Sequence, residues 1–441
     1  MSFIRLAVVG SPDDGKSTLL GRLFVDGKML KSDQLRDLTD TKTQKINLAF
    51  VSDGLRSERE KSITIDAAYK HLRLAGQDFL IADCPGHFEF MKNAVSAVSQ
   101  SQALLLLIDA ELGIRDQTLR HLSLASFFGL SKTIVCVNKM DAVNFDEVVF
   151  SRIQKQLSEN EIFGVKPAIE VIPISALQGE NLFQASEKMK WYQGPTLLQS
   201  LIKIKSEGVK RSPKLRVFVQ TSVSAPDDTQ HCLVQSNGAE ICMGDSLVTE
   251  SGQILPPIDK IYSIDNENLA SGKGRSALRL SFKEPITLKR STILCASDSQ
   301  PRLSRDFSAK ILWISDKNPS SLSEKDFIRV PGREVFLKSF HWKNSSPIGL
   351  SLDLSGRHQN SLFDAAISLA EEVAVDALDP EYFSNEVTLN SFLIFSHQDF
   401  ECLAVGRILE NSNDAKICPD FAKVEKTGLA AELSPQACPV Q

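Results

Sequence analysis

The sequence predicts a multi-domain protein in which an α/β domain with a mostly parallel sheet is followed by two antiparallel β-barrel domains. The chain has 441 residues, about three times the ~150 residues of a typical domain. Between residues 4 and 206, short apolar runs of strand type alternate with longer segments of helical period, as in parallel strands joined by crossover helices. After Pro213, runs of strand type are separated by turns that contain Gly, Pro and Asn, which is typical of antiparallel sheets.

The expected strands of the first domain are residues 4–9, 79–83, 104–109, 133–138 and 170–174. Apolar residues at three- and four-residue spacing predict one helix through residues 90–98 and another through residues 119–128, which Gly129 stops. Pro195 opens a last helix through residues 197–202, and this helix leads into a polar stretch. We therefore place the first domain at residues 1–207.

Further runs of strand type in the second half are residues 215–219, 278–282, 286–288, 310–314, 334–342, 387–396 and 401–409. The polar segment 297–306 is the expected seam between two barrels, which places them at residues 213–300 and 305–410. A helix-like insert at residues 362–375 interrupts the second barrel. The tail at residues 411–441 has no period, and we expect it to be loosely held.

The composition excludes several classes of protein. Hydrophobic residues make up 42% and charged residues 24% of the chain, which is the balance of an ordinary globular protein. The net charge of -5 gives no general attraction to nucleic acid or to an anionic membrane. Apolar runs are far shorter than the ~18 residues of a membrane span, and the 8 cysteines form no C-x-x-C pair. We expect a cytoplasmic protein with reduced thiols.

A phosphate-binding loop is the first chemical motif. The residues Gly10-Ser11-Pro12-Asp13-Asp14-Gly15-Lys16-Ser17 fit the pattern G-x-x-x-x-G-K-[ST], and they lie between a predicted strand and a helix, as this motif requires. The glycines allow backbone N–H groups to turn toward phosphates, and Lys16 reaches the β- and γ-phosphates. The positive end of the following helix adds to this attraction. The loop predicts a nucleoside triphosphate as ligand.

The base is predicted by two segments that follow apolar strands. Asn138-Lys139-Met140-Asp141 and Ser175-Ala176-Leu177 would lie at the carboxyl edge of the sheet, where ligands bind. An Asp there accepts hydrogen bonds from N1–H and the 2-amino group of guanine. Adenine would leave that carboxylate unpaired, at a cost of several kcal/mol. The expected nucleotide is therefore GTP.

A magnesium site is expected beside the phosphate loop. Ser17 offers a hydroxyl to Mg²⁺, and Asp83, which ends a strand before Cys84-Pro85-Gly86, would act through water. Thr64 is the candidate for a further hydroxyl ligand. His87 directly follows Gly86, next to the expected γ-phosphate, where a residue that positions the attacking water is needed.

These residues together resemble the translational-factor class of GTPases, and within it the GTPase subunit of bacterial sulfate adenylyltransferase. The resemblance to this subunit is carried by residues 10–23, 52–69 and 108–121, and residues 191–198 are shared with elongation factors. It implies catalytic roles for His87, Lys16 and Gly86, and Mg²⁺ ligation by Ser17, Thr64 and Asp83. The GTP-binding set that it implies is Asp13, Asp14, Gly15, Lys16, Ser17, Thr18, Asn138, Lys139, Asp141, Ser175, Ala176 and Leu177.

The resemblance also implies a function and a partner. In this family, GTP hydrolysis on the large subunit drives formation of adenosine 5′-phosphosulfate and pyrophosphate from ATP and sulfate on a catalytic small subunit. That small subunit is the expected partner, and no nucleic acid or membrane is expected. No second phosphate loop follows residue 300, so we expect no fused adenylylsulfate kinase domain.

The chain departs from the family at three places. Ser62 stands where a glycine is expected, Pro12 where elongation factors have an apolar gate residue, and Thr229-Gln230-His231-Cys232 where an Arg-Gly pair is expected.

Two other functions remain as alternatives. A factor that delivers a charged tRNA predicts a basic barrel surface and the elongation-factor sequence at residues 111–121, and neither is evident. A regulatory GTPase without a sulfate role is the other.

Overall fold

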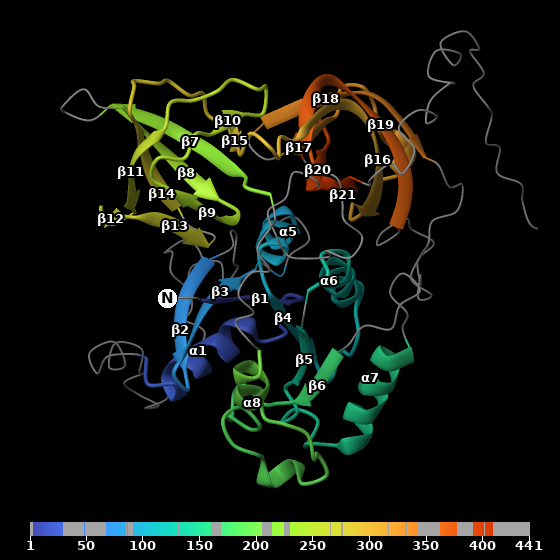
Figure 1. The fold of residues 1–441 in the computed structure, drawn as a ribbon. Coiled ribbons are helices and arrows are strands. Elements are labelled where there is room, and N and C mark those ends of the chain that lie inside the picture. Colours follow the sequence, from blue (N-terminus) through green and yellow to red (C-terminus); the bar gives the residue numbers. More distant parts are fainter. Residues whose placement is uncertain are drawn as a thin grey trace, which may run out of the picture.

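The computed structural model describes residues 3–29, 48, 68–84, 86, 91–130, 132–159, 169–204, 214–224, 230–264, 266–274, 277–315, 317–330, 333–342, 362–376, 391–400 and 402–408. An α/β domain is followed by an antiparallel seven-stranded unit and a closed six-stranded barrel (Figure 1). This order confirms the predicted fold class.

The α/β domain is built on a six-stranded sheet with the order β2-β3-β1-β4-β5-β6. Its elements are β1 (Ile4–Gly10), α1 (Lys16–Asp26), β2 (Ala68–Leu74), β3 (Gln77–Asp83), α5 (Met91–Ser99), β4 (Ala103–Asp109), α6 (Asp116–Phe127), β5 (Lys132–Asn138), α7 (Glu147–Glu159), β6 (Ile169–Pro173), the 3₁₀ turn η2 (Glu187–Met189) and α8 (Leu197–Ile202). Only β2 pairs antiparallel. The five predicted strands and the three predicted helices are confirmed, whereas β2 and α7 were not predicted.

Alternation along the strands decides which helices cover which face of this sheet. Leu6 and Val8 of β1 belong to a core with α1 and α8, whereas Ala7 and Val9 belong to a core with α5, α6 and α7. Every residue of β4 is buried, as expected for a central parallel strand covered on both faces. The carboxyl ends of β1, β3, β4 and β5 therefore meet at one edge, which is where a ligand site forms in such sheets.

The seven-stranded unit has the strand order β10-β15-β7-β8-β14-β11-β12, and the pair β13-β9 lies beside it. Its strands are β7 (Val217–Ser224), β8 (Gln230–Ser236), β9 (Gly238–Cys242), β10 (Val248–Thr249), β11 (Ile258–Ser263), β12 (Asn268–Leu269), β13 (Ser271–Gly274), β14 (Ala277–Phe282) and β15 (Ile293–Cys295). All ladders are antiparallel. They enclose one core that includes Val217, Val234 and Leu280.

The six-stranded barrel closes through pairing of β16 with β21. Its elements are β16 (Arg302–Trp313), the 3₁₀ turn η3 (Pro319–Ser321), β17 (Phe327–Val330), β18 (Arg333–Trp342), β19 (Leu362–Val375), β20 (Ser391–Phe395) and β21 (Cys402–Ile408). Closure leaves no exposed sheet edge, so each strand finds hydrogen-bond partners on both sides. The predicted tail at 411–441 lies outside the described residues.

The prediction of a helix-like insert at residues 362–375 is wrong, because this segment is the long strand β19. It pairs with β16 on one side and with β18 on the other. Phe363, Ala365, Ile367 and Leu369 are buried at two-residue spacing, which is the period of a strand with one face in the core. Pairing with two neighbouring strands overrides the helical propensity of its Ala, Leu and Glu residues.

Two smaller expectations are also corrected. Residues 286–288 form no strand, because the hydroxyl of Ser222 donates to the carbonyl oxygen of Leu288 at 2.8 Å and accepts from its N–H at 3.3 Å. The hydroxyl thus supplies the hydrogen bonds that a neighbouring strand would otherwise make with the backbone of Leu288. The proposed seam at residues 297–306 is only partly a linker, since β16 already begins at Arg302.

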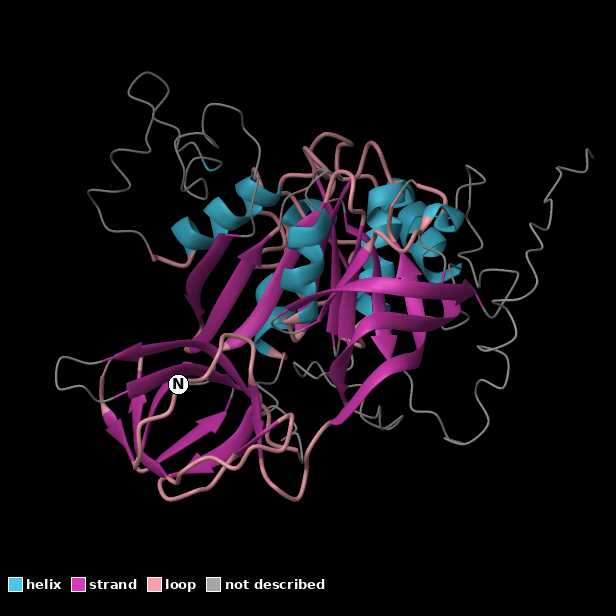
Figure 2. Ribbon diagram, turned by 90° about the horizontal axis from the view of Figure 1, so that it is seen from above, coloured by secondary structure: helices cyan, strands magenta, loops and turns pink. Residues whose placement is uncertain are grey.

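The six-stranded barrel packs on helices of the α/β domain. Outward-facing Leu312, Phe327 and Val405 share one apolar core with residues of α5 and α6. Arg407 of β21 also donates to the carbonyl oxygen of Phe127, at the end of α6, at 3.1 Å. Figure 1 shows α5 and α6 between the sheet and the barrel, and Figure 2 gives a second view of the same arrangement.

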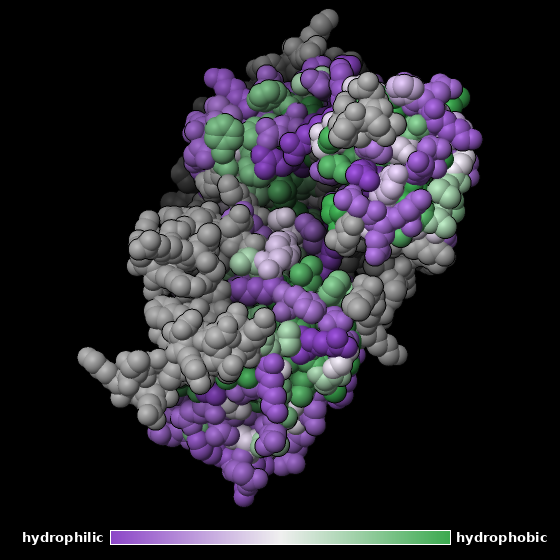
Figure 3. Space-filling view, turned by 90° about the vertical axis from the view of Figure 1, so that its left-hand side faces the viewer, coloured by the Kyte–Doolittle hydropathy of each residue, from purple (hydrophilic) through white to green (hydrophobic). Residues whose placement is uncertain are grey.

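Where Figure 3 is coloured, most of the surface is hydrophilic, and its apolar residues occur in small groups. Such scattered apolar residues are normal on a folded protein. Among the described helices, none has the length and apolar character needed to cross a membrane.

Candidate nucleotide-binding site

The predicted phosphate loop connects β1 to α1. Gly15 has a φ of 93°, and a Cβ there would lie 2.4 Å from Nδ2 of Asn138, so this position requires glycine for conformation and for space. Asp13 also has a positive φ of 65°. Lys16, Ser17 and Thr18 form the first turn of α1, where backbone N–H groups are available to a ligand.

Lys16 and Gly86 lie together in the loop. The Lys16 ammonium is buried and donates to the carbonyl oxygens of Gly10 at 2.9 Å and Ser11 at 2.8 Å. Burial lowers the pKa of Lys16, while Asp14 and Asp83 oppose this shift. A Cβ on Gly86 would lie 2.5 Å from Lys16 Nζ, which is too close. A glycine here therefore lets the segment after β3 touch the phosphate loop.

Asn138, at the end of β5, connects the phosphate loop to the segments predicted to bind the base. Its Nδ2 donates to the carbonyl oxygen of Asp14 at 2.8 Å, and its Oδ1 accepts from the N–H of Ala176 at 2.9 Å. Lys139 has a φ of 62°, and its ammonium lies 2.7 Å from Oδ2 of Asp109. One buried amide thus holds together three segments that are distant in the sequence.

The predicted base-binding residues are brought to one place. Ser175 donates its hydroxyl to Asp141 Oδ1 at 2.5 Å and accepts from the N–H of Gln178 at 3.1 Å. Ala176 is buried, whereas Leu177 is 62% exposed, and Arg22 of α1 donates to the Leu177 carbonyl oxygen. The Ser175 hydroxyl therefore fixes the orientation of the Asp141 carboxylate.

The residues predicted to bind Mg²⁺ are described in part. Ser17 lies on α1, and Asp83 is buried at the end of β3. Hydroxyl and carboxylate oxygens are the ligands that Mg²⁺ prefers, so this donor set fits the ion. Lys70 of β2 places its ammonium 3.2 Å from Asp83 Oδ2, a contact that the sequence did not predict. Thr64 and His87 lie outside the described residues.

Arg115 is a second residue of the site that sequence reasoning missed. It directly precedes α6, and its guanidinium contacts the Asp14 carboxylate of the phosphate loop. No motif marks this arginine in the sequence. The only available signal was its place shortly after β4, whose end lies at the ligand edge of the sheet.

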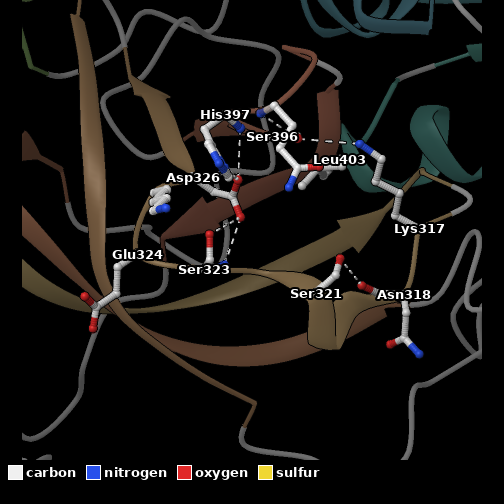
Figure 4. A pocket seen from close by; sticks show the side chains of 11 residues that line it. Lys317, Asn318, Ser321, Ser323, Glu324, Asp326, Ser396, His397 and Leu403 are labelled. Atoms are coloured by element: carbon white, nitrogen blue, oxygen red, sulfur yellow. Dashed lines mark hydrogen bonds and ion pairs between the residues drawn. The ribbon is translucent and has the colours of Figure 1, made fainter.

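A cavity of about 720 Å³ lies elsewhere, in the six-stranded barrel (Figure 4). Buried Asp326 accepts from the ring Nδ1 of His397 at 3.0 Å, from the His397 N–H at 2.9 Å and from the Ser323 N–H at 2.8 Å. Lys317 reaches Ser396 and Asp399. These groups satisfy one another, and they brace the loops between β16 and β17 and between β20 and β21.

Comparisons with known proteins agree with the fold and the site. Residues 1–207 match the elongation factor Tu GTP binding domain family, so the fold and the loop define a GTPase of the elongation-factor class. The chain is 32% identical to sulfate adenylyltransferase subunit 1 of Aliarcobacter butzleri, over 93% of this chain and 88% of that protein. It is 30% identical to the bifunctional enzyme CysN/CysC of Mycobacterium tuberculosis, over 99% of this chain and 72% of that protein. The chain belongs to the family of sulfate adenylyltransferase subunit 1.

Solved structures show the same fold at low sequence identity. The GTP-bound GTPase-like domain of Ski7 from S. cerevisiae matches with a TM-score of 0.60 at 17% identity, covering 92% of this chain and 97% of that chain. A bacterial selenocysteine-specific elongation factor matches with a TM-score of 0.52 at 19% identity, over 92% of this chain and 58% of that chain. These likenesses concern the fold alone.

Proposed function

We propose that this chain is the GTP-hydrolysing regulatory subunit of a sulfate adenylyltransferase. It couples hydrolysis of GTP to GDP and phosphate with formation of adenosine 5′-phosphosulfate and pyrophosphate from ATP and sulfate on a partner subunit. The observation that carries the proposal is the Asn138 amide, which in a chain of this family joins the phosphate loop to Ala176, the neighbour of the Ser175–Asp141 pair. We place the complex in the cytoplasm.

The site residues have separable roles in this proposal. Lys16 and the first N–H groups of α1 bind the phosphates, and Asp141 selects guanine. His87 orients the attacking water, and Gly86 allows its segment to approach Lys16. Ser17, Thr64 and Asp83 would hold Mg²⁺, which neutralises charge that develops on the phosphates.

Each domain has its own role in this proposal. We take residues 1–207 as the hydrolysing unit, residues 213–300 and the barrel that begins at Arg302 as the units that meet the partner, and residues 411–441 as a tail. The buried contact between Arg407 and the end of α6 supports coupling, because it connects barrel and GTPase domain directly.

Reconstitution tests the proposal. The chain alone should bind GTP in the presence of Mg²⁺ but release no pyrophosphate from ATP and sulfate. Addition of a catalytic small subunit should give a complex on size-exclusion chromatography and sulfate-dependent pyrophosphate release. A chain that binds GTP but forms no complex with that subunit, at micromolar concentrations of both, would exclude the proposed role and leave a GTPase with another output.

A further inference from the structure

The guanidinium of Arg115 clamps the turn of the phosphate loop. Its Nη2 donates to the carbonyl oxygen of Pro12 at 3.3 Å and also contacts Asp14 Oδ1. Arg115 is fixed from its own side, because its backbone N–H donates to the Thr118 hydroxyl at 3.2 Å, in the first turn of α6. One side chain thus bridges two residues of the loop from a helix that belongs to a different part of the chain.

Asp14 is the buried end of this contact. Asp14 is 1% exposed. Its Oδ2 accepts from the Ser11 N–H at 2.7 Å, and its backbone N–H donates to the Ser11 carbonyl oxygen at 3.3 Å. The Asp14 side chain therefore closes the turn through its hydrogen bond from Ser11.

The charges around Asp14 come from three elements. Burial raises the pKa of Asp14, and Arg115 is the strongest group that opposes this shift, followed by the Ser11 N–H and by Lys16 on α1. Asp109 at the end of β4 acts in the other direction, although Lys139 pairs with it at 2.7 Å. In the proposed site, Lys16 binds the phosphates of the nucleotide. Arg115 is therefore the cation that compensates the charge of Asp14.

A negative carboxylate inside a phosphate loop is unfavourable for a polyanionic ligand unless a cation compensates it. We propose that Arg115 is a positioning residue of the nucleotide site, which neutralises Asp14 and holds the Pro12–Asp14 turn in the shape that binds the phosphates of GTP and GDP. The inference rests on the proposed GTP site and adds to it a residue that no motif contains. Arg115 needs no direct contact with the nucleotide for this role.

Affinity as a function of pH tests the inference. Binding of a fluorescent GDP analogue with Mg²⁺ is measured from pH 5.5 to pH 8.5 for the wild type, Arg115→Met, Arg115→Lys, and the double variant Arg115→Met/Asp14→Asn. Arg152→Met, on the exposed face of α7, is the matched control. Methionine keeps the length of the arginine stem but removes its charge.

Arg115→Met should bind at least about 10-fold more weakly than the wild type at pH 8. It should recover as the pH falls, because Asp14 without its cation takes up a proton more readily. Arg115→Lys should restore part of the affinity, and the double variant should lose the additional pH dependence. A loss that is equal at every pH, or no loss, would overturn the inference.

A second measurement distinguishes failure of the Arg115 hypothesis from failure of the proposed nucleotide site. Thermal unfolding of the nucleotide-free chain over the same pH range needs no ligand. The difference in Tm between wild type and Arg115→Met should grow as the pH rises, since the uncompensated carboxylate is then ionised. Failure of the wild type to bind GDP would refute the nucleotide site, whereas a Tm difference that is constant with pH would refute the role of Arg115.

Discussion

Arg216 and Asp376 form a buried ion pair that joins the seven-stranded unit to the six-stranded barrel. Arg216 Nε donates to Asp376 Oδ2 at 2.9 Å, and Nη2 donates to Oδ1 at 2.5 Å. Its Nη1 donates to the carbonyl oxygens of Leu215 at 2.8 Å and Ser299 at 2.7 Å. Arg216 is 1% exposed, so the guanidinium is satisfied by protein groups in place of water.

Loss of one partner of this pair should be costly. Arg216→Met or Asp376→Leu alone is expected to lower the free energy of unfolding by about 3–5 kcal/mol, because each leaves a buried charge without its partner. The double variant should recover much of the loss. Urea unfolding of the three variants and the wild type measures this coupling.

The exposed pair of Lys155 and Glu159 on α7 provides the control, with an Nζ–Oε1 distance of 3.7 Å. Removing it should change the free energy of unfolding by less than about 0.5 kcal/mol. Single variants of the buried pair that cost no more than this control would contradict its role in fixing the two units.

Asp326 makes the stability of the six-stranded barrel depend on pH. Burial opposes ionisation of Asp326, but the hydrogen bonds from His397 and Ser323 outweigh it and hold the pKa of the carboxyl below its ordinary value of 3.8. A depressed carboxyl pKa stabilises the folded state above the unfolded pKa, and this contribution is lost as the pH falls through the folded pKa.

Asp326→Asn should therefore lower the free energy of unfolding at pH 7 by roughly 1–3 kcal/mol, the cost of weakening hydrogen bonds to a buried charge. The difference from the wild type should shrink as the pH falls below about 4. Urea midpoints at pH 7, 5, 4 and 3 measure it, and a difference that widens in acid would show that the carboxylate is not the stabilising form.

Asp141→Asn should convert preference for guanine into preference for xanthine. An amide donates to the 2-oxo group of xanthine where the carboxylate accepted from the 2-amino group of guanine. Ser175, which orients Asp141 in the structure, can hold the amide oxygen in the same place. Competition binding among GTP, XTP and ATP measures the change, and unaltered preference for GTP would refute base recognition by Asp141.

His87→Ala should slow hydrolysis by roughly 10²-fold or more and leave GTP affinity within a few-fold, which is the scale of a lost positioning or acid–base group. Single-turnover hydrolysis of pre-bound GTP separates the two effects. An unchanged rate would return His87 to the role of a polar residue at the start of a helix.

The five parallel strands of the α/β domain were predictable because their signals are local, whereas β2 and α7 were not predicted. The strands β1, β3, β4 and β5 each contain a run of apolar residues, and the phosphate loop combines fixed residues with a strand before it and a helix after it. The position of Asn138 at the carboxyl edge of the sheet was also predictable, since parallel strands bring their carboxyl ends to the same edge.

The features that were missed depend on distant partners. Asp14 and Arg115 are separated by 101 residues, so the local sequence around either residue does not predict their contact. Strand β19 was mistaken for a helix because the two strands that pair with it begin elsewhere in the chain, although its buried residues alternate at two-residue spacing. Tertiary pairing decides such segments, and local propensity does not.

In the proposed function, GTP on this chain controls adenylyl transfer on the partner subunit. Sulfate-dependent pyrophosphate release is measured with the reconstituted complex in the presence of GTP, GDP or a non-hydrolysable GTP analogue, and with Lys16→Ala. GTP should accelerate synthesis above the level with GDP or the analogue, and Lys16→Ala should remove this acceleration because the phosphates lose their cation. Synthesis by an active complex at the same rate with all three nucleotides would contradict this control by GTP.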